Sequence, residues 1–225
     1  MFEQRGSTMR KIGENVFQLE TSKGCNGYVI SGGDRTAVID PGMASGYDSL
    51  LTELRNAEPR TGRVTDILLT HYDPDHSHVA KRLQAALKAT VYISTADAAI
   101  LRGEVRAPTL VRRFLDRMMK ADYPANVVEI TGTLEIFPGL LAFPTPGHTP
   151  GHTGFRWKDM LFTGDAVRVT KHGDMKQFYR LVTSDKAMAR TTERLLRERI
   201  KAEEIEWICA GHNPPTRWVG GDAEW

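Results

Sequence analysis

Residues 66–76 read DILLTHYDPDH, a short apolar run followed directly by four potential metal ligands. Side chains two apart in an extended segment point the same way, so His71 and Asp73 can face one metal ion together. The proline between the two aspartates cannot continue a regular ladder and is expected to turn the chain. Asp75 and His76 then begin the next helix, from which they can reach a second ion. For this cluster alone, a polar loop with an N-capping aspartate is the simpler alternative.

Three further segments place a histidine or an aspartate just past an apolar strand and next to a glycine. They read PTPGHTPGHT at residues 144–153, FTGD at 162–165 and AGH at 210–212. Glycine allows the backbone to approach its neighbours closely at such positions. Four strand ends with ligand-type residues would be an odd coincidence in a protein without a metal, so the combined pattern predicts a metal centre.

The two halves of the chain share one plan: strands, then a helix, then a strand that ends in polar residues. This alternation favours an α/β fold in which two sheets pack against each other with helices outside. Between the halves, residues 97–122 are expected to be helical and basic, with Leu110, Phe114 and Met118 packed inward and arginines such as Arg112 on a solvated face. The expected strands lie at 15–20, 28–31, 36–40, 66–70, 91–94, 127–130, 134–136, 140–143, 154–157, 160–163 and 205–210, and the other expected helices at 47–57, 79–89 and 184–200.

Length and composition limit the classes of protein that remain. The 225 residues suit one domain, and 40% hydrophobic with 26% charged residues is ordinary for a globular protein. A formal charge of +2 gives no reason to expect nucleic acid or an anionic membrane as a partner. No apolar run reaches membrane-spanning length, and the first residues lack the apolar core of a signal peptide. Cys25 and Cys209 are expected to be free thiols, and the expected location is the cytoplasm.

The order of these motifs resembles the metallo-β-lactamase superfamily, including its glyoxalase II-like hydrolases. The segment NGY at residues 26–28, ahead of a hairpin that ends in IDPG at 39–42, also resembles the beginning of that family. The resemblance implies a four-layer αββα sandwich, in which two mixed β-sheets pack face to face with helices outside. It also implies a single domain over residues 1–225, with a helical insertion at about 97–122.

The resemblance assigns the metal ligands residue by residue. The first ion would be bound by His71, Asp73 and His148, where His148 is preferred to His152 because the family's ligand is the first histidine of such a repeat. The remaining ligands would bind the second ion, with one aspartate shared between both ions and two aspartates as the expected catalytic residues. These are Asp75, His76 and His212 for the second ion, Asp165 as the bridge, and Asp75 and Asp165 as catalytic residues.

Asp73 departs from the common family pattern HxHxDH, in which a histidine occupies this position. Zinc is the metal that the family implies, but a carboxylate is a harder ligand than imidazole and makes iron or manganese credible. With Asp73, the three aspartates and a bridging hydroxide would balance the four charges of two divalent ions. The ligands alone therefore predict a neutral centre that acidifies its water less than a centre with histidine at position 73.

The resemblance implies a metal-dependent hydrolase that uses a dinuclear centre and a bridging hydroxide to cleave an ester, a thioester or a lactone. A non-haem iron oxidoreductase acting on oxygen or a sulfur compound is the alternative, and Asp73 is its support. A nuclease would need a larger inserted domain, and a metal sensor would need lost ligands. The expected partner is a small-molecule substrate, with His172 and Tyr179 as candidate contacts, and a homodimer is left open.

Overall fold

The first sheet of the computed structural model, which describes residues 9–119, 121–170 and 173–218, has seven strands in the order β1-β2-β3-β4-β5-β6-β7. Strands β1 to β4 pair antiparallel and β4 to β7 pair parallel, so the sheet is mixed. Its strands are β1 (Arg10–Gly13), β2 (Val16–Gln18), β3 (Tyr28–Ser31), β4 (Thr36–Ile39), β5 (Asp66–Leu68), β6 (Thr90–Ser94) and β7 (Val127–Ile130).

The second sheet has six strands in the order β15-β14-β11-β10-β9-β8, and only β11 and β14 pair parallel. A separate hairpin of β12 and β13 follows β11. The bounds are β8 (Leu134–Phe137), β9 (Leu140–Pro144), β10 (Thr153–Trp157), β11 (Met160–Gly164), β12 (Val167–Val169), β13 (Met175–Gln177), β14 (Trp207–Ala210) and β15 (Thr216–Arg217).

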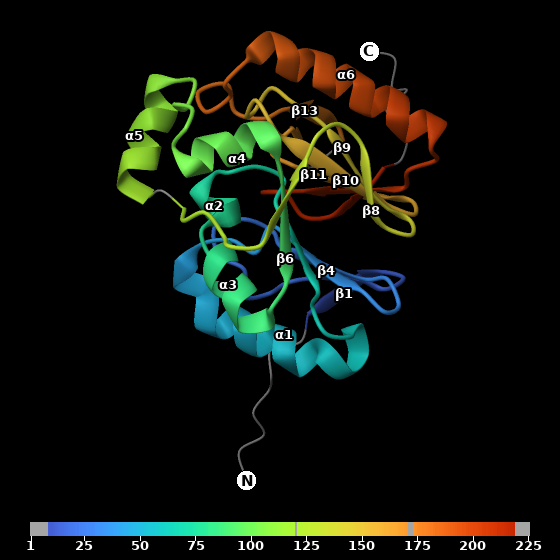
Figure 1. Cartoon of the computed structure of the whole chain (residues 1–225). Coiled ribbons are helices and arrows are strands. Elements are labelled where there is room, and N and C mark those ends of the chain that lie inside the picture. Colours follow the sequence, from blue (N-terminus) through green and yellow to red (C-terminus); the bar gives the residue numbers. More distant parts are fainter. Residues whose placement is uncertain (1–8, 120, 171–172, 219–225) are drawn as a thin grey trace.

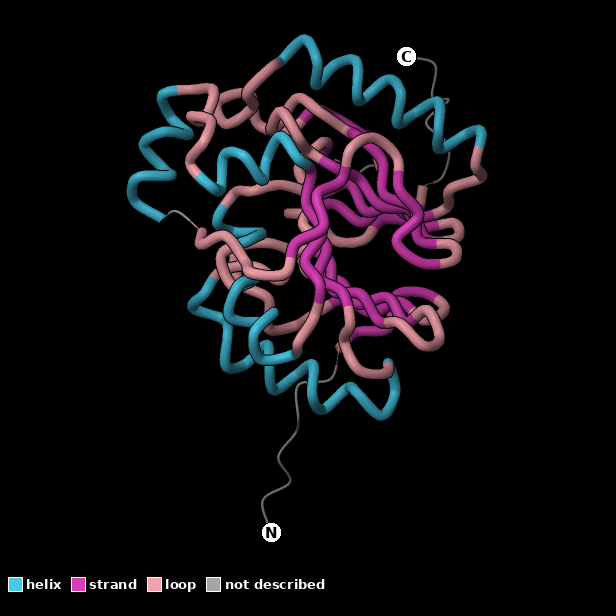
Figure 2. Tube along the Cα trace, viewed as in Figure 1, coloured by secondary structure: helices cyan, strands magenta, loops and turns pink. Residues whose placement is uncertain are grey.

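Helices cover the outer faces of both sheets (Figure 1). Figure 2 shows the two sheets stacked in the middle of the molecule, with helices above and below them. The helical segments are η1 (Ala44–Gly46), α1 (Tyr47–Thr61), α2 (Pro74–Ser77), α3 (Ala80–Leu87), α4 (Thr95–Arg102), α5 (Leu110–Met119) and α6 (Lys186–Ala202). The four-layer αββα sandwich expected from the sequence is thereby confirmed.

Alternation along the central strands explains the four layers. In β4, Ala37 and Ile39 belong to the core between the two sheets, whereas Val38 belongs to the core under the helices. In β11, Phe162 faces the other sheet and Leu161 packs with the residues that contact α6. Successive strand side chains point to opposite faces, so an all-apolar strand must be covered on both sides.

The segment expected at 97–122 differs from its prediction in two ways. It forms two helices, α4 and α5, separated by residues 103–109, and residue 120 lies outside the described residues. The prediction that its apolar residues pack inward was wrong: Leu110 is 79% exposed, Phe114 64% and Met118 66%. Arg112 is the buried residue of α5. The helix lies at the periphery (Figure 1). It directs the polar side chain of Arg112 towards the protein and its apolar stripe towards solvent.

The first long helix, α1, extends further than the sequence predicts. It continues past residue 57 to Thr61, with Pro59 in its last turns, and ends at Gly62 with φ of 79°. Both cysteines, Cys25 and Cys209, are free, as expected. Among the described residues, no helix is both long enough and apolar enough to cross a membrane.

Candidate metal centre

Four loops converge at the edge of the sandwich because each follows a strand that ends there. β5 leads into residues 71–76, and β9 leads into the loop that carries His148. β11 and β14 pair parallel, so Asp165 and His212, which follow them, emerge at the same end. The backbone N–H of Thr153 donates to the carbonyl of Thr70 at 2.7 Å, which joins the loops of the two sheets.

The structure brings all seven residues predicted as metal ligands together. Within the described residues, ligand atoms form three groups whose members lie within 4.8 Å of one another. In the first predicted set, Asp73 Oδ2 lies 3.4 Å from Nε2 of His71 and 3.1 Å from Nε2 of His148. In the second, His212 Nε2 lies 3.3 Å from Asp75 Oδ2 and 3.4 Å from His76 Nε2. The groups are His71, Asp73 and His148; Asp75, His76 and His212; and His71, His76 and Asp165.

Asp165 lies between the two predicted sets. Its Oδ1 is 3.6 Å from His76 Nε2, and its Oδ2 is 3.2 Å from His212 Nε2 and 3.6 Å from His148 Nε2. One carboxylate oxygen therefore faces the second set, and the other lies between both sets. This is the position that the resemblance implies for a bridging ligand.

Buried partners orient the imidazoles of His71 and His76. The hydroxyl of Thr70 donates to Asp40 Oδ2 at 2.7 Å, so it accepts from His71 Nδ1 at 2.9 Å. His76 Nδ1 lies 2.9 Å from the same oxygen of Asp40 and donates to it. Both Nε2 atoms are thereby left with their lone pairs directed into the site, as outer partners of metal-binding histidines usually arrange.

Polar atoms without partners show that the site fits metal ions. Nε2 of His71 and Oδ1 of Asp165 are buried and have no hydrogen-bond partner among the described residues. Leaving such atoms unsatisfied costs about 1–3 kcal/mol each, so native proteins rarely do so where no water or ion binds. Imidazole and carboxylate are donors that zinc, iron and manganese all accept.

His152 supports the site from outside the ligand set. Its Nε2 accepts a hydrogen bond from the backbone N–H of Asp165 at 3.1 Å, and its Nδ1 lies 2.7 Å from Thr145 Oγ1. Both ring nitrogens are therefore engaged with protein. This agrees with the choice of His148 over His152 as the ligand.

Two glycines let the loops approach one another. Gly164 has φ of 46°, and a Cβ there would lie 2.5 Å from Thr70 Oγ1. A Cβ at Gly211 would lie 2.8 Å from His76 Cε1 and closer still to Asp165. A side chain at either position would push the ligand loops apart, which agrees with the role inferred for glycines beside the ligands.

The charges of the site favour binding of a cation. Burial alone would raise the pKa of Asp165, but the imidazoles of His76 and His212 outweigh it and hold that pKa well below its usual range. Burial lowers the pKa of His148 to about 4, so its ring is neutral at pH 7. Burial opposes charge on His212, yet the carboxylates of Asp165 and Asp75 raise its pKa to about 9. A metal ion must displace that proton, so the second set is expected to bind metal more tightly as the pH rises towards 9.

Arg112 is a residue of the site that the sequence analysis missed. Its Nη1 donates to Asp73 Oδ1, and its Nη2 lies 3.0 Å from Nε2 of His148. The same Nη2 donates to the backbone carbonyls of His148 at 3.0 Å and Val182 at 2.6 Å. The interpretation of Arg112 as one of a solvated basic run was therefore wrong. The only feature of the sequence that could have distinguished Arg112 from the other arginines is its position on the helix face opposite Leu110 and Phe114.

Asp97, also missed, ties the ligand loops of the two sheets together. Its Oδ2 accepts from Thr149 Oγ1 at 2.6 Å and from the backbone N–H of Tyr72 at 3.2 Å. Its Oδ1 accepts from the N–H of Gly151 at 2.7 Å. Burial raises the pKa of Asp97 to about 6, although the bonds from Thr149 and Gly151 act in the opposite direction.

The two candidate substrate-binding residues are His172 and Tyr179. His172 lies outside the described residues. Tyr179 is 60% exposed and packs on Phe178, with ring centroids 5.0 Å apart. Phe178 contacts the centre instead: its ring lies 5.0 Å from that of His148 and 5.4 Å from that of His212.

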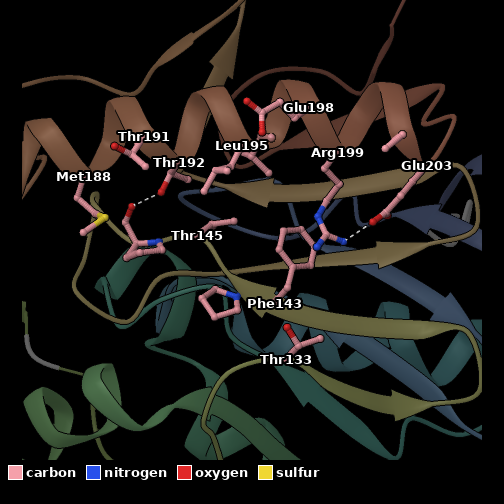
Figure 3. A pocket seen from close by; sticks show the side chains of 14 residues that line it. Thr133, Phe143, Thr145, Met188, Thr191, Thr192, Leu195, Glu198, Arg199 and Glu203 are labelled. Carbon is pink, nitrogen blue, oxygen red and sulfur yellow. Dashed lines mark hydrogen bonds and ion pairs between the residues drawn. The ribbon is translucent and has the colours of Figure 1, made fainter.

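Two of the cavities among the described residues differ in their relation to the centre. A cavity of about 260 Å³ adjoins it and is lined by Met43, Asp73, Pro74, Asp75, Arg112, Leu115, Asp116 and Met119. A larger one of about 420 Å³ lies between α6 and β9, away from the ligands (Figure 3). Its lining includes Phe143, Thr192 and Arg199 but none of the seven predicted ligands. Of these two cavities, the smaller one is lined by predicted ligands and is therefore open to chemistry at the centre.

Comparisons with known proteins agree with this arrangement. A family model described as the metallo-beta-lactamase superfamily matches residues 21–212. A hydroxyacylglutathione hydrolase from Fuscovulum blasticum is 31% identical over 137 residues, which cover 59% of this chain and 43% of that protein. The uncharacterized protein YobT from Bacillus subtilis (strain 168) is 29% identical over 153 residues, which cover 64% of this chain and 62% of YobT. The chain thus spans about half the length of these relatives.

Solved structures resemble more than nine tenths of the chain. The structure of TTHA1623 in a di-iron-bound form has a TM-score of 0.64 at 23% identity and covers 93% of this chain and 94% of that one. The metallo-beta-lactamase family protein TTHA1429 from Thermus thermophilus has a TM-score of 0.65 at 22% identity, with 91% of this chain and 75% of that one covered. At these identities the likeness shows the fold alone.

Proposed function

Because the chain belongs to the metallo-beta-lactamase superfamily, we propose that it is a metal-dependent hydrolase of an ester, a thioester or a lactone. The observation that carries the proposal is the convergence of seven imidazole and carboxylate groups from four strand ends. Two of their buried atoms, Nε2 of His71 and Oδ1 of Asp165, have no other partner among the described residues.

The proposed ligands form two sets that share one aspartate. The first ion would be held by His71, Asp73 and His148, and the second by the other set, with Asp165 between them. When bound, such ions would lower the pKa of a water molecule towards neutrality and would polarise the carbonyl of the substrate. The second set consists of Asp75, His76 and His212.

Asp75 is the ligand best placed to act on water and substrate. Its side chain is 36% exposed, against 4% for Asp165, and it lines the cavity of about 260 Å³ beside the centre. A carboxylate at this place can orient a water molecule and pass a proton to the leaving group. Phe178 packs against the rings of His148 and His212, with ring centroids 5.0 Å and 5.4 Å away.

A thioester is the first substrate class to test. Relatives with about 30% identity are named hydroxyacylglutathione hydrolases, and a thioester is the bond that this name describes. The chain covers less than half of those proteins, so substrate choice in this chain is a matter for direct measurement. We propose a small molecule as the partner, and a homodimer stays a prediction.

The test is hydrolysis by the metal-loaded protein on a panel of a hydroxyacyl thioester, a lactone, an aryl ester, a β-lactam and a phosphodiester. Turnover of the thioester, ester or lactone is expected, and Asp165→Asn should lower it more than about a hundredfold because both sets lose a shared ligand. The exposed Asp122→Asn is the matched control and should leave the rate unchanged. No turnover on the panel, or full activity of Asp165→Asn, would contradict the proposal.

An iron oxidoreductase remains the second candidate because Asp73 supplies a harder ligand than the usual histidine. Metal analysis of protein purified without added metal or chelator separates the two. About two zinc ions per chain favour the hydrolase, whereas iron with a visible absorption band favours oxygen or sulfur chemistry. Less than about 0.2 metal per chain after reconstitution would contradict both.

A further inference from the structure

Arg112 reaches the first predicted metal set from the peripheral helix α5. Its side chain is buried, and both terminal nitrogens are engaged. One donates to Asp73 Oδ1, and the other donates to the carbonyls of His148 and Val182. Its guanidinium carbon lies 5.5 Å from the centre of the Tyr72 ring, a cation–π contact. A rigid fork held at so many points is well suited to fix a carboxylate.

The two oxygens of Asp73 have different surroundings. Oδ1 is occupied by Arg112, whereas Oδ2 faces His71 and His148 at 3.4 and 3.1 Å. With its rotation fixed at one oxygen, the carboxylate can present only the other to an ion. An aspartate is shorter than a histidine, and without Arg112 its carboxylate could rotate away from the ion. The contact with Arg112 therefore allows Asp73 to act as a ligand at the position where the family pattern has a histidine.

Arg112 also changes the charge of the centre. A centre with histidine at position 73 would carry the two carboxylates of Asp75 and Asp165. Asp73 adds a third negative charge, and the guanidinium, which stays protonated in proteins, cancels it. The neutral centre expected from the ligands alone omitted this buried cation. With Arg112 included, the net charge equals that of a histidine-bearing centre.

We propose that Arg112 is a positioning residue for the first metal ion. It holds Asp73 by one carboxylate oxygen and so directs the other oxygen into the site. Its positive charge also cancels the negative charge that Asp73 adds. The inference rests on the proposed function only in that the centre binds metal. It treats Asp73 and Arg112 as one unit that replaces a histidine.

The contact with His148 defines the opposing hypothesis. A guanidinium can only donate, so Nη2 of Arg112, at 3.0 Å, takes the lone pair of His148 Nε2, the predicted ligand atom. If that contact dominated, Arg112 would exclude the first ion instead of supporting it. Under our proposal the ion takes Nε2, and Nη2 keeps the carbonyls of His148 and Val182.

The experiment is Zn²⁺ titration of the metal-free full chain against a competing chelator, which yields stoichiometry and both affinities without any substrate. Arg112→Met should weaken the first ion by about tenfold or more and leave the second unchanged. The unchanged second affinity shows that the variant is folded. Arg112→Lys keeps the positive charge without the two-pronged guanidinium, so its affinity for the first ion should lie between those of wild type and Arg112→Met. Arg117→Met, an exposed arginine of the same helix, is the matched control.

A double substitution tests whether the two residues form a unit. Asp73→His alone should bind the first ion poorly, because it leaves a cation beside two imidazoles and a new imidazole. Asp73→His with Arg112→Met should recover at least about tenfold in affinity over either single variant. Failure of this rescue, with a folded double variant, would overturn the proposal.

The outcomes separate this inference from the proposed function. A wild-type chain that binds no Zn²⁺ overturns both. A wild-type chain that binds two ions, with Arg112→Met binding both equally well, overturns the inference alone. A wild-type chain that binds one ion, with Arg112→Met binding two, shows that Arg112 excludes the first ion and overturns the inference.

Discussion

Nδ1 of His76 lies 2.9 Å from Oδ2 of Asp40, and both side chains are buried. The same oxygen accepts from Thr70, which in turn orients His71, so one carboxylate orients a ligand from each predicted metal set. Asp40 directly follows β4, in the middle of the first sheet. The aspartate of the IDPG segment thus orients two predicted ligands and is not in any of the three ligand groups.

Asp40→Asn is expected to weaken metal binding by about ten- to a hundredfold. The backbone N–H of Thr70 donates to the other oxygen of Asp40, Oδ1, at 2.8 Å. An amide accepts at one end only, so the bonds from Thr70 and His76 to both oxygens cannot all be kept. Asparagine also tolerates the φ of 47° at this position, so the backbone should be unaffected. Chelator competition measures the change, and Asp34→Asn in an exposed bend is the control. Equal affinities in the two variants would contradict this role.

Asp97 is expected to make stability depend on pH. Its folded pKa of about 6 is above the value of 3.8 for a free aspartate, so the folded state binds the proton more tightly. The contribution to stability is therefore present below about pH 4 and is lost as the pH rises to about 6. In metal-free protein, the free energy of unfolding of wild type relative to that of Asp97→Asn should fall by about 3 kcal/mol over this range. Urea unfolding at several pH values measures it, and a pH-independent difference would refute it.

Gly211→Ala should impair metal binding at the second set while the fold is kept. The added methyl would lie 2.8 Å from His76 and closer to Asp165, so these ligands must move. Gly132→Ala is the comparison, because nothing lies within 4 Å of its Cβ and its φ of 75° costs only about 1 kcal/mol of stability. Zn²⁺ affinity should fall in the first variant and not in the second. The reverse order would argue against close approach at Gly211.

Phe114→Ser should change the unfolding free energy by no more than about 0.5 kcal/mol, because the ring is 64% exposed on α5. Leu54→Ala in α1, where the side chain is 3% exposed, should cost about 2–5 kcal/mol. Denaturant unfolding compares the two. A large loss at Phe114 would mean that another surface covers this face in solution.

The chemistry of the centre could be predicted from the sequence because it is local. His71, Asp165 and His212 each follow an apolar strand, and strands that pair parallel end at one edge whatever their packing. The unbroken apolar runs in these strands likewise required cover on both faces, which is why the four-layer arrangement was predictable.

Contacts between distant segments depended on the tertiary structure. Arg112 and Asp73 are 39 positions apart, and their pairing depends on how a peripheral helix rotates about its axis. The apolar stripe through Phe114 predicted the opposite rotation, because burial of apolar area is the only rotational signal that a sequence carries. Here the ion pair of Arg112 with Asp73, together with its bonds to two backbone carbonyls, fixes the helix instead. The sequence thus determined the ligands and the strand ends that carry them, while tertiary packing alone decided which cation lies beside Asp73.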